Sequence, residues 1–113
     1  MRHTLAGIAL YNIELDGCLS GVYSNDDEKV AGEIFNEICR KRKTSNTSED
    51  SLVGTYDCFY FDLKNERCSA ILEIDNHKKT YLFTWKDIDG KKVIFEGVGY
   101  KMNNNQIAVH YTG

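Results

Sequence analysis

Five β-type segments fill the second half of the chain, and this series constrains the fold more than any other feature of the sequence. Each segment is rich in β-branched and aromatic residues that alternate with polar ones, which is typical of strands. Polar turn segments rich in Asn, Asp, Lys or Gly separate them at intervals of about 12 residues, the spacing of an antiparallel meander. The strands that we expect cover residues 52–63, 68–75, 80–87, 92–100 and 105–112.

The first half of the chain predicts a hairpin followed by a helix. The dipeptide Asp16-Gly17 separates two β-type runs, residues 8–15 and 18–23, and Asp-Gly is a strong two-residue hairpin signal. A helix is then predicted over about residues 27–43, because apolar residues recur there at helical spacing and the basic run 40–43 suits a helix C-terminus. The residues on its apolar face are Val30, Ile34, Phe35, Ile38 and Cys39.

These elements predict a mainly β fold, with about seven antiparallel strands in one domain spanning residues 1–113. A meander of this size is expected to close into a small barrel or to fold over on itself, because closure removes exposed strand edges. The helix would then cover one end of the barrel, or its outer face near Gly97 and Gly99. The net charge of −3 argues against nucleic acid as a partner, and no apolar run is long enough for a membrane helix.

The four cysteines favour free thiols in a cytoplasmic protein. No secretory cleavage pattern follows the first residues, and no pair of cysteines has the CxxC spacing of a zinc site. The three histidines are scattered along the chain, so neither a metal nor a cofactor is expected. Cys58 and Cys68 are expected on opposite faces of neighbouring strands and should not form a disulfide.

The turns also predict which side chains face the interior, because a turn fixes the residues that lie opposite each other in a hairpin. Turns centred on residues 65–66, 77–78, 89–90 and 103–104 give one consistently apolar face across the five strands. That face carries Thr55, Asp57, Phe59, Phe61, Leu63, Cys68, Ala70, Leu72, Ile74, Tyr81, Phe83, Trp85, Ile94, Glu96, Val98, Tyr100, Ile107, Val109 and Tyr111. The opposite face includes Tyr56, Cys58, Tyr60, Phe95, Gly97 and His110.

The meander resembles the small calycin-type barrels, lipocalin-like and avidin-like proteins, and also small bacterial barrels with no assigned activity. The segments that carry the resemblance are Gly54-Thr-Tyr, Tyr81-Leu-Phe-Thr-Trp85, Phe95-Glu-Gly-Val-Gly99 and Ile107-Ala-Val-His-Tyr111. The resemblance implies a non-enzymatic protein that binds a small, largely apolar molecule inside the barrel. The predicted helix and the missing Gly-x-Trp pattern depart from those families, so no ligand residue is transferred by position.

Glu96 is the main candidate for a polar anchor in such a site. The predicted register places it between Phe83 and Tyr111, where partial desolvation would favour a ligand or proton-transfer role. Asp57 lies on the same predicted face and would approach Glu96 if the barrel closes. Alternatively, Glu96 lies at the rim, or a one-residue slip turns it towards water.

Aromatic residues supply the remaining candidates. Phe59, Phe83, Trp85 and Tyr111 would line an apolar pocket, or they simply pack as core. Tyr56, Tyr60 and Phe95 would form a patch on the other face, covered by the helix or free to contact a partner. His110, beside Gly97 on that face, is read as an ordinary surface residue.

Three functions therefore compete. The first is binding of a small apolar ligand in the interior. The second is a protein-interaction or regulatory module with a side-chain-filled barrel, for which a second copy of the chain is one candidate partner. The third is a small enzyme that uses Glu96 as an acid or base.

Overall fold

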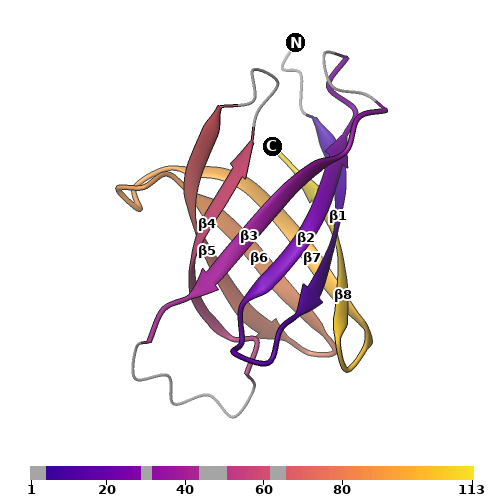
Figure 1. The fold of residues 1–113 in the computed structure, drawn as a ribbon, viewed down its shortest axis with the longest axis vertical. Helices are drawn as coiled ribbons and strands as arrows, with labels where there is room; N and C mark the ends of the chain where they lie inside the picture. Colours follow the sequence, from indigo (N-terminus) through magenta and orange to yellow (C-terminus); the bar gives the residue numbers. More distant parts are fainter. Residues whose placement is uncertain (1–4, 29–31, 44–50, 62–65) are drawn as a thin grey trace.

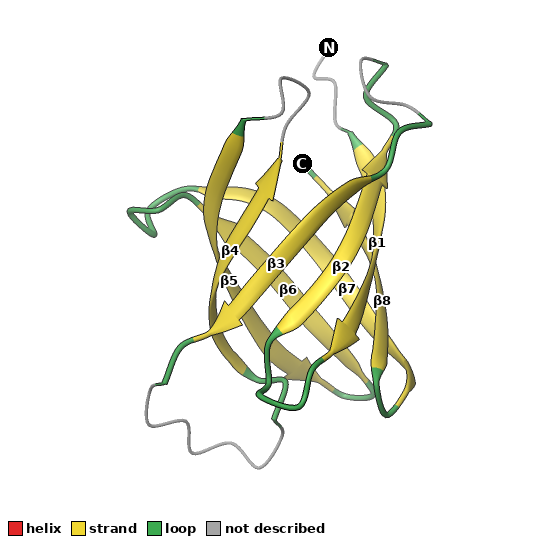
Figure 2. Ribbon diagram, viewed as in Figure 1, coloured by secondary structure: helices red, strands yellow, loops and turns green. Residues whose placement is uncertain are grey.

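Eight antiparallel strands form a closed barrel in the computed structural model, which describes residues 5–28, 32–43, 51–61 and 66–113 (Figures 1 and 2). Each strand pairs with the next in sequence, and the last pairs with the first. The strands are β1 (Ala6–Ile13), β2 (Leu19–Asn25), β3 (Phe35–Lys41), β4 (Gly54–Phe61), β5 (Arg67–His77), β6 (Thr80–Lys86), β7 (Val93–Asn103) and β8 (Gln106–Thr112). The predicted fold class, an antiparallel meander that closes into a barrel, is confirmed.

The β1–β8 pair closes the barrel. Leu10 of β1 lies opposite Val22 of β2 on one side and Ala108 of β8 on the other. Two backbone hydrogen bonds between Leu5 and Gly113 extend this pairing, with N–O distances of 3.0 and 3.1 Å.

Within the described residues, no helix is long and apolar enough to cross a membrane.

The predicted helix over residues 27–43 is wrong where the structure describes that segment, and residues 29–31 lie outside the described residues. Residues 35–41 form β3, which pairs with β2 and β4 and makes eight strands rather than seven. The burial pattern of β3 alternates, so its apolar residues do not form one helical face: Cys39 is buried, whereas Ile38 points outwards and is 51% exposed. Both faces of β3 carry apolar residues, and together these residues happen to fall at spacings that resemble those of a helix.

The predicted hairpin at Asp16-Gly17 is confirmed, but its loop consists of residues 15–17 rather than of two residues, because Glu14 pairs with Cys18. Gly17 has a φ of 87° and donates its N–H to the Glu14 carbonyl at 3.0 Å, as a tight turn between β1 and β2 requires. Other turns use the same chemistry: Gly90, between β6 and β7, has a φ of 70° and donates to the Asp87 carbonyl at 2.8 Å.

The barrel interior is filled by large side chains, as expected for eight strands. The largest fully buried ones are Tyr11, Tyr56, Phe83, Leu19, Leu52, Leu72, Ile74 and Ile107. Inward-facing glycines make room for them. A Cβ on Gly21 would collide with the Leu10 carbonyl oxygen and come within 2.7 Å of the Tyr11 ring, and a Cβ on Gly99 would lie 2.6 Å from the Phe83 ring.

The predicted interior face is correct for three of the five meander strands. The inward residues of β5, β6 and β8 include Leu72, Phe83 and Val109, as expected. On β4 and β7 the faces are inverted. Tyr56 and Cys58, which were expected on the outer face, are fully buried. Tyr60 and Phe95, expected in an outer aromatic patch, pack against the core. Cys58 and Cys68 therefore face the same side, and both are free thiols.

The inversion on β7 has a local cause. Trp85 lies opposite Phe95, but its neighbour Lys86 lies opposite Val93, so Ile94 is an extra residue in a β-bulge. Because side chains alternate with a period of two, one extra residue turns every following side chain to the other face.

Candidate functional site

Glu37 is the one charged side chain that the structure buries within its described residues, and it lies inside the barrel. Its exposed fraction is 6%. β3 places it there because residues 35, 37, 39 and 41 alternate with outward-facing ones, and Cys39 is the next inward residue. A buried carboxylate is costly unless several hydrogen bonds satisfy it, so its surroundings decide what it can do.

In the described part of the chain, three groups donate to the Glu37 carboxylate. The Tyr11 hydroxyl of β1 donates to Oε1 at 2.7 Å. The Trp85 indole N–H of β6 donates to Oε2 at 3.1 Å, and the Cys39 thiol donates to the same oxygen at 3.2 Å. All three groups donate, which is the arrangement that an ionised carboxylate, an acceptor only, requires. Three different strands therefore hold one carboxylate across the interior.

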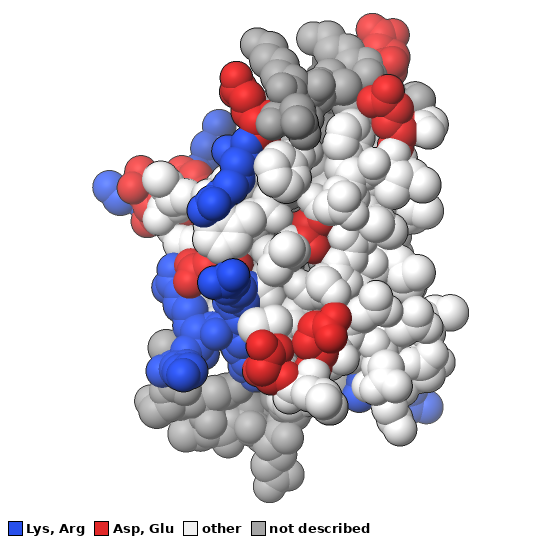
Figure 3. Space-filling model, viewed as in Figure 1, with Lys and Arg blue, Asp and Glu red and all other residues white. Residues whose placement is uncertain are grey.

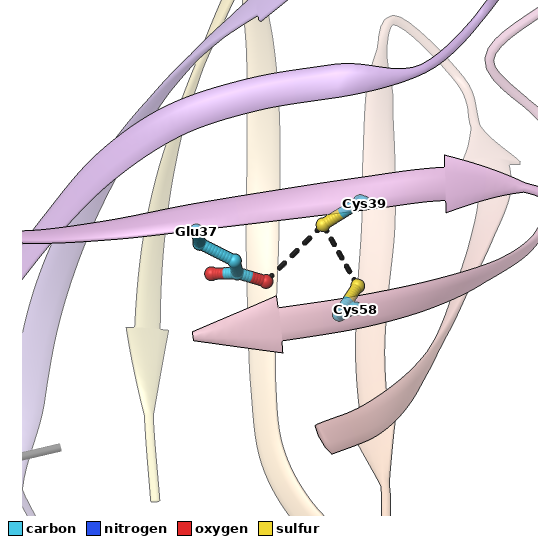
Figure 4. A group of neighbouring side chains, drawn as sticks. All are labelled: Glu37, Cys39 and Cys58. Carbon is cyan, nitrogen blue, oxygen red and sulfur yellow. Dashed lines mark hydrogen bonds between the residues drawn. The ribbon is translucent and has the colours of Figure 1, made fainter. Parts of the chain in front are cut away.

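Two cysteines extend this group away from the carboxylate. Cys39 and Cys58 lie directly opposite each other on β3 and β4, and both are fully buried. Figure 4 shows the resulting chain: Cys58 Sγ lies 2.7 Å from Cys39 Sγ, to which it donates, and Cys39 Sγ contacts Glu37 Oε2. Both thiols are free.

This environment holds the neighbouring groups in their neutral forms. Burial, reinforced by the Glu37 charge, raises the pKa of the Tyr11 hydroxyl well above its usual value. Burial likewise raises the pKa of the Cys39 thiol well above the ordinary range and raises the pKa of Cys58. The two cysteines are therefore protonated at neutral pH and are not activated nucleophiles.

A group of aromatic residues lies near Glu37, which one of them, Trp85, contacts directly. They lie close to the barrel end where β2, β4, β6 and β8 finish and β3 and β7 begin, the upper end in Figure 1. We call them the upper aromatic cluster: Tyr23, Phe35, Tyr60, Trp85, Phe95 and Tyr111. One wall carries Tyr23, whose ring stacks on Phe35 at 5.5 Å and meets Tyr60 edge-on at 6.1 Å. The other wall belongs to β6, β7 and β8.

On that second wall the rings of Trp85, Phe95 and Tyr111 contact one another in pairs. Their centroids are 6.4 Å apart for Trp85–Phe95, 5.8 Å for Trp85–Tyr111 and 5.7 Å for Phe95–Tyr111. The Tyr111 hydroxyl also donates to the Ser24 carbonyl at 3.2 Å, which connects this wall to β2. Tyr23, Phe35, Tyr60 and Phe95 are only partly buried, so this end is less tightly closed than the middle of the barrel.

Three of the six residues predicted to bind a ligand lie in the interior. Phe83, Trp85 and Tyr111 are all buried, with exposed fractions of 1%, 5% and 6%. Trp85 and Tyr111 belong to the upper aromatic cluster, and Phe83 lies beside Trp85 with the ring centroids 5.6 Å apart. Their predicted position inside the barrel is correct.

The other three face outwards. Asp57 forms an ion pair with Arg42 at 2.8 Å, and both side chains are more than 40% exposed. That hydrogen bond lowers the pKa of Asp57. The Phe59 ring lies on the same outer side, and the Arg67 guanidinium stacks over it at 4.4 Å. The predicted approach of Asp57 to Glu96 inside the barrel is therefore wrong.

Glu96 lies opposite Thr84 and Thr112 rather than Phe83 and Tyr111. Gly97 occupies the predicted position between those aromatic rings. The Ile94 bulge shifts the pairing of β7 with β6 by one residue. A second irregularity, between Lys101 and Asn103, shifts its pairing with β8. Glu96 lines a surface groove of about 400 Å³ across β6, β7 and β8. His110 faces outwards as well, where its ring stacks on Tyr100.

Glu37, Cys39 and Tyr11 were missed as site residues, although a signal exists for the first two. Glu37 and Cys39 are two residues apart, so they share one face of any strand that contains them. The alternation became uninformative once residues 27–43 were interpreted as a helix. Tyr11 had no such signal, because both faces of β1 carry apolar residues: Ile8 and Leu10 face outwards, whereas Ala9 and Tyr11 face inwards.

No family model, curated protein or solved structure matches this chain. The closed antiparallel barrel is consistent with the calycin type in general. Any function has to be inferred from the geometry of the interior.

Proposed function

We propose that this barrel binds a small, largely apolar ligand between the two walls of the upper aromatic cluster, with Glu37 as the polar anchor. The observation that carries the proposal is the buried Glu37 carboxylate, which accepts a hydrogen bond from Trp85 of the upper aromatic cluster. Small-molecule sites usually combine apolar walls with a few placed polar groups of this kind.

The charge of Glu37 indicates the ligand chemistry. Its oxygens accept three neutral hydrogen bonds, and no cation among the described residues forms an ion pair with it. A buried carboxylate that lacks a counter-ion favours a ligand that supplies one, because an ion pair offsets part of the desolvation cost. A protonated amine would do so, and the aromatic rings would attract the same cation through their faces. We therefore propose an arylalkyl or alkyl amine.

Trp85 provides a direct reporter for this site. It is the single tryptophan of the sequence, and its N–H contacts Glu37. Titration with 2-phenylethylamine should change its fluorescence saturably, whereas 3-phenylpropionate, which has the same ring and a carboxylate, should not. A saturable response to the carboxylate and none to the amine would overturn the proposed ligand class. No response to either, or to longer-chain amines, would overturn the proposed site.

Paired variants identify the anchor. Glu37→Gln keeps the size of the side chain and removes its charge, so it should weaken amine binding at least about tenfold, or about 1.4 kcal/mol. Glu96→Gln removes an equivalent charge from the outer surface and should leave binding unchanged. Both variants are first compared with the wild type by denaturant unfolding, so that a loss of binding is read only from folded protein. Equal effects of the two changes would overturn the role of Glu37.

A second candidate function, self-association, is favoured by the outer surface of β1, β2 and β8. A groove of about 540 Å³ there is lined by uncharged side chains together with His110. Its outward residues include Ile8, Leu10 and Val22, with exposed fractions of 68%, 42% and 38%. The side chains over β1 and β2 in Figure 3 are almost all uncharged, in contrast to the basic groups over the lower ends of β3 and β4. Such apolar surface is typical of an interface.

We propose a second copy of this chain as its partner, because an uncharged face can meet its own copy without charge repulsion. Sedimentation equilibrium of the wild type should then show a concentration-dependent dimer. Leu10→Lys should shift the molecule to monomer, whereas Ile88→Lys, at an apolar residue that is exposed away from this groove, should not. A wild type that stays monomeric across the accessible concentration range would overturn this candidate.

A further inference from the structure

Three potential metal ligands meet in the interior of the barrel, below the proposed amine site. Glu37 Oε2, Cys39 Sγ and Cys58 Sγ come from β3 and β4, and one ligand atom from each lies within 4.8 Å of the others (Figure 4). All three residues are buried. Two sulfurs and one carboxylate oxygen, converging away from water, suit thiophilic cations such as Zn²⁺ or Cd²⁺.

We propose that Glu37, Cys39 and Cys58 bind one thiophilic divalent cation. This inference goes beyond the proposed amine binding, with which it shares Glu37 and the hydrogen-bond donor Trp85. The hydrogen-bond chain supports it: two thiol protons now occupy the positions between the three ligand atoms, one between the sulfurs and one between Cys39 Sγ and Glu37 Oε2. The cation would take the place of these two protons.

The exchange balances in charge. The metal-free group carries one negative charge, on Glu37, and two neutral thiols. Binding of M²⁺ forms two metal–sulfur bonds and one metal–oxygen bond, breaks two S–H bonds and releases two protons to solvent. The complex again carries one negative charge, so its interactions with the surrounding core change little.

The required movement is small. Zinc–sulfur distances of about 2.3 Å at a tetrahedral angle separate two sulfurs by about 3.8 Å. The sulfurs are now 2.7 Å apart, so they would have to move apart by about 1 Å. Cys39 and Cys58 lie on adjacent strands and point to the same side, so side-chain rotation can provide this opening.

Tyr11 and Trp85 would form the outer shell of the site. Each donates to a Glu37 oxygen from a strand that supplies no ligand, which fixes the orientation of the carboxylate. Ligating carboxylates in metal sites are held by hydrogen bonds of this kind. Three protein ligands leave a fourth position for a water molecule or another donor.

Titration of the reduced protein with Cd²⁺ or Co²⁺ under anaerobic conditions tests the proposal. We expect one cation per chain, a thiolate-to-metal absorption band and release of about two protons. The affinity should rise about 100-fold per pH unit near neutrality, because two protonated thiols must ionise. Binding without a thiolate band, or with no release of protons, would overturn the site.

The four cysteines provide a matched control. Cys39→Ser with Cys58→Ser should abolish the absorption band and tight binding, whereas Cys18→Ser with Cys68→Ser should leave both unchanged. Glu37→Gln should weaken binding at least about tenfold while the thiolate band persists. A full response in the first double variant, or its loss in the second, would overturn the proposed ligands.

The same variants separate this proposal from amine binding. The Cys39→Ser and Cys58→Ser double variant should still bind 2-phenylethylamine, because Glu37 and the aromatic walls remain. A wild type that binds the amine but no metal would therefore overturn only the metal site. A wild type that binds metal but no amine would overturn only the amine site.

Discussion

The Tyr11 hydroxyl and the Glu37 carboxylate are joined by a 2.7 Å hydrogen bond across the interior of the barrel, although 26 residues separate them in sequence. The bond connects β1 to β3, two strands that are not neighbours in the sheet. It therefore links the position of a buried charge to the packing of β1, which is separated from β3 by one strand.

Tyr11→Phe should destabilise the protein by about 1.5–3 kcal/mol, because it removes a hydrogen bond to a buried charged group and keeps the ring. Urea unfolding measures this change. Tyr100→Phe is the control, since the Tyr100 hydroxyl contacts only the exposed His110 ring among the described partners. That substitution should stay within about 0.5 kcal/mol of the wild type. Equal effects would show that the Tyr11 bond contributes nothing specific.

Gly21→Ala should destabilise the barrel by about 1–3 kcal/mol, because the added methyl group overpacks a filled interior. The new Cβ would collide with the Leu10 carbonyl oxygen and the Tyr11 ring, so the backbone of β1 would have to shift. Ser20→Ala, at the neighbouring outward position, tests whether β2 tolerates alanine in general, and it removes only one exposed hydrogen bond, from Ser20 Oγ to Glu14. The midpoint of denaturant unfolding should fall for the glycine variant and change little for the serine variant.

The Asp57–Arg42 pair should make a small contribution to stability that disappears in acid. Its hydrogen bond lowers the pKa of Asp57 in the folded state, so the stabilisation is present above the unfolded-state pKa of about 3.9 and is lost as pH falls through the folded pKa. Both side chains are more than 40% exposed, which limits the effect to below about 1 kcal/mol.

Asp57→Asn should remove this contribution, and so should high salt, whereas Glu96→Gln should leave it in place. Stability curves measured against pH for the three proteins would show the difference. A steeper acid loss in Asp57→Asn than in the wild type would contradict the assignment.

The thiols should react in two classes. Cys18 and Cys68 are partly exposed, whereas Cys39 and Cys58 are fully buried and have raised pKa values. An aromatic disulfide reagent should therefore modify two thiols quickly in the native protein and the other two only on unfolding. Mass spectrometry of the partially modified protein identifies them. Early modification of Cys39 or Cys58 would mean that the interior opens readily.

A strand keeps its predicted inward face when its register differs from the predicted one by an even number of residues, and loses it when the difference is odd. The pair Ile74 and Phe83 shows a register two residues from the one expected for β5 and β6, and a shift of two leaves every side chain on its predicted face. Asp57 lies opposite Ile71, three residues from the expected Ile74, and an odd shift inverts the face of β4. The bulge at Ile94 inverts β7 in the same way.

Glu37 was not predicted as a site residue for a different reason. Phe35, Ile38 and Cys39 fit helical spacing, and the basic residues that follow fit a helix end, so local pattern alone favoured a helix. The pairing of β3 with two neighbouring strands decides its conformation, and that pairing is a tertiary interaction that the segment itself does not encode. The overall architecture was predictable because turn spacing is local, whereas the choice of buried carboxylate was not.

Barrel closure has a consequence for how the chain folds. Seven strand pairings in the described barrel join consecutive strands and can form as local hairpins, whereas the eighth joins residues as distant as Leu10 and Ala108. The loop-entropy cost falls mainly on that last step. Until β1 meets β8, both strands have unpaired edges that could recruit another chain. Substitutions that loosen β1 should therefore promote aggregation during refolding before they alter the native structure.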